Sequence, residues 1–375
     1  MMNEHLFIVL AKEHYNPLNA IRSLGEKGIN PIFIAIKTKT TVSSKSKYIS
    51  KTHYVENIEE AYELLLKEYG NSDESRKPFL FCTDDYSIGY LDSHYDEIKD
   101  KFIYFNAGKK DGINKYMDKG EILNLAGKHG LNYASTVVCN KGDIPKDIQY
   151  PIITKSISPN IGGWKSDVFI CHSEDELKDA YMKIKAPQVL IQQYIDKKNE
   201  LEYYGMSIKH GEQVLISTAN DYLYLIPGYY SPYMNTFEPP YPDVQQKIAA
   251  MIKEIGFEGI FSVEFLRDAD DKLYFLEINL RIPTWTYAST CAGMNLPYLW
   301  ALSMLNSDIP ADAKKAFEPF KAVVEPIDYQ KRVVERGYDY KEWIIDVINC
   351  KCHYYYNAED PEPFYEMVRN NENMR

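Results

Sequence analysis

The 375-residue sequence lacks the features that mark disulfide-rich, zinc-binding or membrane-inserted proteins. Its six cysteines are scattered and form no CxxC pair, so we expect reduced thiols rather than disulfides or a metal–thiolate site. The apolar run at residues 6–11 is too short for a signal peptide, and no run approaches the ~20 residues of a membrane-spanning helix. These absences predict a cytoplasmic protein with no membrane partner.

The sequence also has fewer positively than negatively charged residues. The chain has 43 lysines and arginines against 54 aspartates and glutamates, for a formal net charge of −11. This balance argues against nucleic acid as a partner, although a polyphosphate could bind through a local cluster of Lys, Arg and a metal ion. The length and the 45% apolar fraction are typical of a globular protein with two or three subdomains.

Residues 1–112 alternate apolar runs with helical patterns. The apolar runs lie at residues 6–11, 32–36, 79–82 and 102–105, and this alternation predicts a parallel, doubly wound α/β sheet. The turn after the first run reads Lys-Glu-His-Tyr-Asn and contains no GxGxxG motif. A dehydrogenase with a dinucleotide bound in this domain is therefore disfavoured.

Tyrosine is abundant, at 32 residues, and gathers with proline in residues 221–242. This composition predicts a long loop, and loops of that length usually serve a site. Tyr229, Tyr230 and Tyr233 are candidate substrate contacts in a lid that excludes water. A packed inter-domain loop would have the same composition, so both interpretations stay open.

The segment FSVEFLRDADDKLYFLEINLRIP predicts a β-hairpin, because the polar DADD separates two apolar runs. A turn centred on the last aspartate pair places Glu264 directly opposite Glu277. Strand alternation then adds Asn279 and Arg281 to the same face and places apolar residues on the other. Four groups suited to a metal and a phosphate are thus predicted to converge.

Opposed carboxylates destabilise a sheet unless a cation lies between them. Mg²⁺ suits such a place because it binds one or two carboxylates together with substrate phosphates, and Mn²⁺ takes similar ligands. Glu264, Glu277 and Asn279 are the predicted metal ligands, and Arg281 can bind a phosphate or carboxylate with its planar fork. The alternative is an exposed hairpin face with solvated charges, which explains single charges better than four converging ones.

At these residues the chain resembles the ATP-grasp superfamily, whose last core strands carry an acidic ligand followed by an E-x-N-x-R strand. The resemblance implies a pre-ATP-grasp doubly wound domain at residues 1–112 and a two-subdomain ATP-grasp fold at 113–310. The latter divides into a small lobe at 113–193 and a metal and substrate lobe at 194–310. Residues 311–375 would then form a C-terminal extension.

The resemblance also implies two ATP-contacting lysines. Lys119 opens a predicted helix that ends at Gly130, and Lys155 ends a predicted strand. These are the places where the family's lysines neutralise phosphate oxygens. Taken alone, each lysine would be interpreted as a surface charge. Their order relative to the hairpin supports the nucleotide-binding interpretation.

Further nucleotide contacts follow from the same resemblance. Gly162 and Gly163 permit a tight loop whose backbone N–H groups cover phosphates, with Lys165 beside them. Trp164 and Lys165 depart from the Gly- and Ser-rich loop of relatives, which puts the phosphate contacts of this loop in question. The residues corresponding to the family's adenine and ribose contacts are Gln193, Tyr194, Ile195, Glu200 and Glu202.

The tail sequence YYYNAEDPEPF resembles the ending of carboxylate–amine ligases related to D-aspartate ligase. This resemblance implies an ATP- and Mg-dependent ligase that joins a small-molecule carboxylate to an amine through an acylphosphate. Arg281 and Lys155 would be its catalytic residues, and a homodimer is the family's expected assembly. An ATP-grasp kinase would have the same nucleotide site, whereas a catalytically silent nucleotide-binding scaffold would not need opposed carboxylates.

Overall fold

The computed structural model describes residues 2–71, 73–146, 148–155, 167–226 and 230–372. The chain divides into two compact units. The first unit contains Met1–Ile113, Glu202–Ser262 and Asn279–Arg375, and the second contains Asn114–Leu201 and Val263–Ile278. The boundaries between the units fall inside one helix, Gly112–Met117, and inside three strands, Asn199–Ile208, Gly259–Arg267 and Leu273–Asn279.

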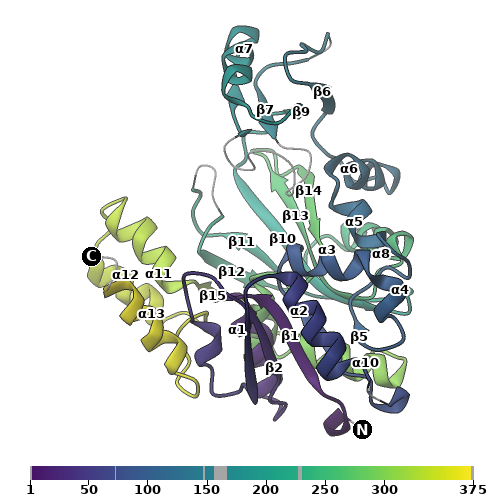
Figure 1. The fold of residues 1–375 in the computed structure, drawn as a ribbon. Coiled ribbons are helices and arrows are strands. Elements are labelled where there is room, and N and C mark those ends of the chain that lie inside the picture. Colours follow the sequence, from purple (N-terminus) through teal and green to yellow (C-terminus); the bar gives the residue numbers. More distant parts are fainter. Residues whose placement is uncertain (1, 72, 147, 156–166, 227–229, 373–375) are drawn as a thin grey trace. The chain divides into compact units, whose positions relative to one another are not determined.

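The N-terminal part of the first unit is a five-stranded sheet of order β3-β2-β1-β4-β5, whose neighbouring strands are all parallel (Figure 1). Its strands are β1 (Phe7–Lys12), β2 (Ile32–Ile36), β3 (Lys51–Val55), β4 (Phe79–Cys82) and β5 (Ile103–Tyr104). The helices between them are α1 (Pro17–Gly25), α2 (Ile58–Leu64), α3 (Asp85–Ser93) and α4 (Tyr95–Ile98). The predicted doubly wound sheet is confirmed, since β2 and β4 are buried along their whole length.

Strand order reverses direction between β1 and β4 in this sheet. The chain runs from β1 to β2 and β3 on one side and then returns to β4 and β5 on the other. In open α/β sheets, a crevice forms at the carboxyl ends of the two strands beside such a reversal. The residues that follow Lys12 and Cys82 therefore lie where such sheets usually bind ligands.

A second sheet has seven strands, in the order β14-β13-β10-β11-β12-β15-β16. Its strands are β10 (Asn199–Ile208), β11 (Gln213–Tyr222), β12 (Tyr233–Phe237), β13 (Gly259–Arg267), β14 (Leu273–Asn279), β15 (Phe320–Val323) and β16 (Cys352–His353). Helices α8 (Pro242–Ile255), α9 (Thr286–Cys291) and α10 (Leu296–Asn306) come from the same part of the chain. The predicted hairpin is present as β13 and β14.

The long loop predicted for residues 221–242 is wrong in part. Its first two residues still belong to β11, and Tyr233–Phe237 forms β12, which pairs antiparallel with β11 and with β15. Prolines on both sides of a short strand made this segment resemble a loop. The strand partners lie far along the chain, so local sequence does not reveal the pairing.

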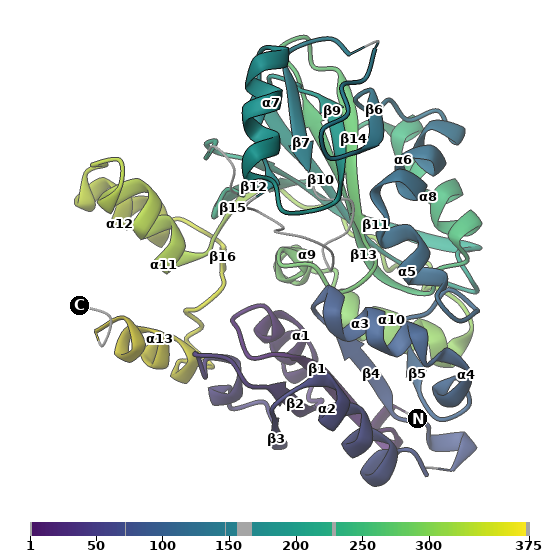
Figure 2. The ribbon, with the colours of Figure 1, turned by 45° about the horizontal axis from the view of Figure 1, so that its top comes forward.

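The second unit contains a four-stranded sheet of order β6-β9-β7-β8. Its elements are β6 (Thr136–Asn140), β7 (Ile152–Lys155), β8 (Ile170–Cys171), β9 (Gln188–Gln193), α5 (Gly112–Met117), α6 (Lys119–Lys128) and α7 (Glu174–Lys183). Helix α7 lies against β7 and β9 (Figure 2), and Leu177 and Tyr181 pack on Ile152 and Ile191 in one apolar cluster. This packing covers one face of the sheet with apolar side chains.

The C-terminal segment of the first unit adds α11 (Glu325–Asp328), α12 (Tyr340–Ile348) and α13 (Glu362–Glu372). A fully buried ion pair joins this segment to α1, because Arg22 Nε donates to Asp360 Oδ2 over 2.9 Å. Arg22 also donates to the carbonyl groups of Tyr354 and Tyr355, while Asp360 accepts from Ser46 Oγ and Lys47 N–H. Residues 354–360 thus connect the C-terminal segment to α1 and to the turn at Ser46 and Lys47.

Among the described residues, no helix is both long and apolar enough to cross a membrane.

Candidate nucleotide and metal site

Lys155 is the last residue of β7, as predicted, and its ammonium group lies on the sheet face opposite α7. Its Nζ donates to Gln192 Oε1 over 2.8 Å, and Gln192 Nε2 donates in turn to Thr136 Oγ1 over 2.9 Å. Three neighbouring strands of the small sheet therefore hold one lysine side chain in place. Sequence reasoning missed Gln192, although strand alternation from Lys155 and the pairing with β9 would have placed it on this face.

The surroundings of Lys155 lower its pKa to about 8. Burial of the ammonium group is the largest cause, and the positive charge of Lys119 acts in the same direction. The carboxylates of Glu277 and Glu200 oppose this shift, and Lys197 adds to it. The second unit thus brings together three predicted site residues around Lys155, and the site has both signs of charge.

Lys119 is the first residue of α6 and is partly exposed. Asp118 caps the helix, since its Oδ1 accepts from the N–H groups of Gly120 and Glu121 at 2.8 and 3.0 Å. Gly130 follows the helix with φ +72°, so the predicted start and end of this helix are confirmed. The cap fixes the backbone from which the Lys119 side chain extends.

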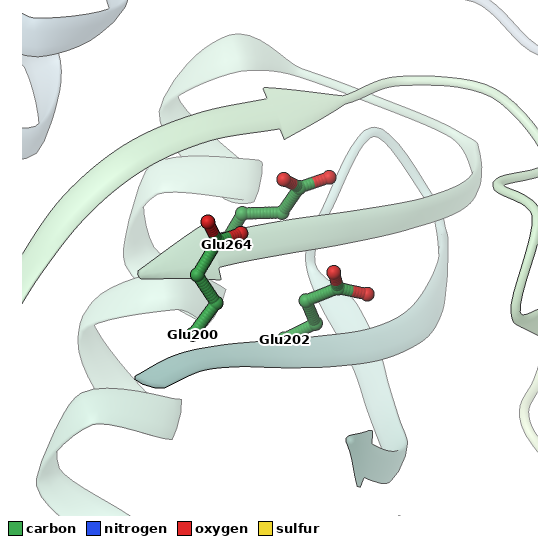
Figure 3. A group of neighbouring side chains, drawn as sticks. All are labelled: Glu200, Glu202 and Glu264. Atoms are coloured by element: carbon green, nitrogen blue, oxygen red, sulfur yellow. The ribbon is translucent and has the colours of Figure 1, made fainter. Parts of the chain in front are cut away.

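Three carboxylates gather on the neighbouring strands β10 and β13 (Figure 3). Glu200, Glu202 and Glu264 each offer an oxygen within 4.8 Å of the others, and the two β10 residues are buried. Glu200 accepts from Lys197 Nζ and Glu202 accepts from the Tyr204 hydroxyl. Glu264 was predicted as a metal ligand and the other two as ribose contacts, so the structure combines parts of two predicted sets.

Carboxylates this close repel one another unless a cation or proton lies among them. Carboxylate oxygens are also the ligands that Mg²⁺ prefers. The donor set of Glu200, Glu202 and Glu264 therefore fits a divalent metal, and the roles predicted for Glu277 and Asn279 on β14 as further ligands stay a prediction. Lys197 and Tyr204 fix one oxygen each of Glu200 and Glu202, which orients the carboxylates in advance.

Strand β14 carries Glu277 and Asn279 as predicted, and the turn before it is one residue longer than expected. Asp268 N–H donates to Lys272 O, and Asp271 has a left-handed backbone with φ +60°. Asn279 Nδ2 donates to Ser262 Oγ over 3.1 Å, so the two strands meet side by side at this level. The direct opposition of Glu264 and Glu277 stays a prediction.

Arg281 lies just beyond β14, whereas the sequence predicted a strand that continues to residue 282. The strand ends earlier because Ile282 N–H donates to Cys82 O of β4 and Pro283 follows. The guanidinium group of Arg281 donates to both carboxylate oxygens of Asp85 and to Asn279 Oδ1. Sequence reasoning missed Asp85 as a partner, since the two residues are 196 positions apart.

The predicted adenine segment follows β9. Gln193 N–H donates to Ser135 O, and Tyr194 N–H donates to Pro151 O, so these two groups are occupied by the chain itself. The Gln193 side chain lies on the opposite face from Lys155, where it lines a cavity of about 560 Å³ with Ile191. The adenine contacts expected at Gln193, Tyr194 and Ile195 stay a prediction.

Of the predicted substrate tyrosines, Tyr230 donates to or accepts from the Tyr15 hydroxyl at 2.7 Å, beside the carboxyl end of β1. Tyr233 is buried in β12, where the Arg332 guanidinium lies 4.3 Å from the centre of its ring. This packing gives Tyr233 a structural role, and its substrate role stays a prediction. Predicted contacts that lie outside the described residues are Gly162, Gly163, Lys165 and Tyr229.

Comparison with known proteins shows solved structures with a similar fold. The solved L-amino acid ligase of Bacillus licheniformis superposes with a TM-score of 0.65 at 12% identity, covering 86% of this chain and 80% of that one. The biotin carboxylase domain of Hydrogenobacter thermophilus 2-oxoglutarate carboxylase, solved as a dimer with MgADP, ADP and bicarbonate, has a TM-score of 0.65 at 17% identity. That match covers 86% of this chain and 75% of the other.

The chain thus has an ATP-grasp fold, in agreement with the fold class that the E-x-N-x-R strand indicated. Residues 239–325, which include the β13–β14 hairpin, match the family described as ATP-grasp in the biosynthetic pathway with Ter operon. In sequence, the chain is 24% identical over 188 residues to the mitochondrial methylcrotonoyl-CoA carboxylase subunit alpha of Dictyostelium discoideum. This match covers 47% of the chain and only 26% of that relative's length.

Proposed function

We propose that this protein is an ATP- and Mg²⁺-dependent ligase that joins a small-molecule carboxylate to an amine. The observation that carries the proposal is the charge arrangement around Lys155, where Lys119, Glu277 and Glu200 all act on one ammonium group. Paired cations beside paired carboxylates suit a triphosphate and its metal better than either charge alone. The ATP-grasp fold adds support, since solved relatives with this fold include an amino acid ligase and an MgADP complex.

The charge of each side chain in the site would determine its role. Lys119 and Lys155 would hold phosphate oxygens, and their ammonium groups would offset the negative charge that moves during phosphoryl transfer. Glu264, Glu277 and Asn279 would hold Mg²⁺ or Mn²⁺, and the adjacent Glu200 and Glu202 would act on the metal or on the ribose hydroxyls. When bound, the metal would neutralise the β- and γ-phosphates and orient them.

The reaction would need no protein nucleophile. The substrate carboxylate would attack the γ-phosphate to give an acylphosphate and ADP, and the amine would then displace phosphate to give the amide. Arg281 lies at the end of β14, where its guanidinium group could stabilise the acylphosphate and the tetrahedral intermediate. Its anchoring to Asp85 keeps the guanidinium at the carboxyl end of β4, beside the crevice expected for a second substrate.

The test is phosphate release from ATP and Mg²⁺ in the presence of pooled amino acids and small carboxylic acids, with mass spectrometry of the products. Glu277→Ala should lower the release at least ~100-fold, because a lost ligand or its support weakens metal binding and transfer. The matched control is Asp270→Ala, an exposed acid in the turn of the same hairpin, which should keep the wild-type rate.

The outcome of this test separates the alternatives. Release that needs one acid and one amine and yields an amide supports the ligase. Release that depends on a single acceptor and yields a phosphorylated product indicates a kinase. ATP binding without release from any pool favours a nucleotide-binding scaffold, and a wild-type rate in Glu277→Ala removes Glu277 from the metal set.

A further inference from the structure

An ion pair connects the end of the E-x-N-x-R strand to the N-terminal sheet within the first unit. Arg281 Nε donates to Asp85 Oδ1 over 2.7 Å, and Arg281 Nη2 donates to Asp85 Oδ2 over 3.1 Å. Two parallel hydrogen bonds of this kind fix the plane of the guanidinium group as well as its position. The Arg281 side chain is 16% exposed and that of Asp85 is 41% exposed, so the pair borders solvent.

The backbone on the Asp85 side is held firmly. Asp84 caps α3, because its Oδ1 accepts from Ser87 N–H over 2.8 Å, and its Oδ2 accepts from Lys12 N–H over 3.1 Å. Asp85 is the first residue of α3 and therefore starts from a capped helix end at the carboxyl edge of β4. Its carboxylate is presented by two rigid elements rather than by a loose loop.

The backbone on the Arg281 side is held as well. Ile282 N–H donates to Cys82 O over 3.0 Å, which joins the residue after Arg281 to the last residue of β4. Arg281 Nη2 also donates to Asn279 Oδ1 over 3.0 Å, and Asn279 Nδ2 donates to Ser262 Oγ over 3.1 Å. The orientation of Arg281 is therefore coupled to that of Asn279, a predicted metal ligand.

We propose that Asp85 is a positioning residue for Arg281, an inference that rests on the proposed ligase function. Asp85 aligns the guanidinium before substrates bind, so that little side-chain freedom is lost when charge develops on the reacting groups. Through Arg281, it also holds the amide of Asn279. An ion pair that borders solvent contributes little to folding stability. A positioning role at the end of the predicted catalytic strand therefore explains this pair better than a purely structural one.

The test combines single and double variants in the ligase assay, once the substrates are known. Asp85→Ala should lower kcat about 10- to 100-fold and change the KM for ATP less than about threefold, because Asp85 acts on the transition state through Arg281. Asp85→Glu should restore part of the loss. Asp312→Ala, which removes an exposed carboxylate paired with Lys315, is the matched control and should leave kcat unchanged.

Coupling between the two residues gives the sharper readout. If Asp85 acts through Arg281, the Asp85→Ala change should cost almost nothing further in an Arg281→Lys background. A wild-type kcat in Asp85→Ala, or losses that multiply in the double variant, would overturn the inference while the ligase function stands. Absence of turnover by the wild-type protein on every pool would instead overturn the proposed function and the inference with it.

Discussion

Two arginine–aspartate pairs in the first unit differ in burial and, we infer, in purpose. The side chains of Arg22 and Asp360 are 1% and 0% exposed, and those of Arg281 and Asp85 are 16% and 41% exposed. The first pair is surrounded by hydrogen bonds to backbone groups, so its charges are fully satisfied by the chain. The second borders the site and shares its arginine with Asn279.

The difference shows how burial decides whether the loss of an ion pair mainly lowers the stability of the protein or mainly lowers its activity. A buried charge that loses its partner keeps its whole desolvation cost, which is typically ~3–5 kcal/mol. A partly exposed charge can be solvated when its partner is lost, so its contribution to stability is about 0–1 kcal/mol. Any large effect at Arg281 must then come from the chemistry that it serves.

The largest expected change in stability is that of the buried pair. Arg22→Met leaves Asp360 buried without its cation, so we expect the free energy of unfolding to fall by ~3–5 kcal/mol. Urea unfolding followed by circular dichroism measures this fall, with Asp85→Ala as the comparison at about 1 kcal/mol or less. The double variant Arg22→Met, Asp360→Leu should recover part of the loss, because it removes the stranded charge. Equal effects of Arg22→Met and Asp85→Ala would break the comparison.

The partly exposed pair should show the opposite combination, a large loss of turnover with little loss of stability. Arg281→Lys keeps the charge and removes the planar fork, so we expect turnover to fall ~10²- to 10³-fold. Its unfolding midpoint in urea should stay close to that of the wild type, because solvent reaches both partners. Steady-state kinetics and urea unfolding of the same preparation separate the two effects. Full activity in Arg281→Lys would show that a point charge is enough at this position.

Lys155 extends the comparison to a cation that donates to a neutral group, the side-chain amide oxygen of Gln192. Its pKa is lowered to about 8, so the ammonium is charged at pH 7 and loses its proton as the pH rises through 8. Bound ATP favours the charged form, so ATP affinity should be flat below pH 7 and fall by at most ~10-fold per pH unit above pH 8. Isothermal titration between pH 6.5 and 9.5 measures this dependence.

The matched variants at Lys155 test the cause. Lys155→Arg, with a guanidinium that stays charged, should bind ATP with no loss of affinity between pH 8 and 9.5. Lys155→Met should weaken ATP binding at every pH by about 10- to 100-fold, since it removes a charge-assisted phosphate contact. A persistent fall above pH 8 in Lys155→Arg would mean that another group titrates, and unchanged affinity in Lys155→Met would remove Lys155 from the site.

Local patterns were enough to predict the elements that carry the site. The strand ending at Lys155, the helix opened by Lys119 and the hairpin with Glu277 are present where apolar runs, caps and turn residues indicated them. These features depend on neighbours within one strand or helix. The sequence therefore predicted the fold class and the elements that carry Lys119, Lys155 and Glu277.

The partners of these residues could not be predicted in the same way. Asp85 contacts Arg281 across 196 positions, and Asp360 contacts Arg22 across 338, so no local pattern links them. Strand β12 was missed because its partners β11 and β15 supply the pairing that its proline-flanked sequence does not suggest. Tertiary contacts thus decide which charges meet, and sequence alone gives only the residues available.

The smallest expected effect belongs to a third, more exposed pair, which gives the comparison its reference point. Arg369 donates to Glu366 over 3.0 Å within α13, and the two side chains are 55% and 14% exposed. Water competes for both groups and salt screens them, so Arg369→Ala should leave the unfolding midpoint and the turnover unchanged within error. Thermal unfolding at low and high salt, beside Arg22→Met, measures this. A loss comparable to that of Arg22→Met would mean that burial does not rank these pairs, and the contrast between the buried and the site pair would lose its physical basis.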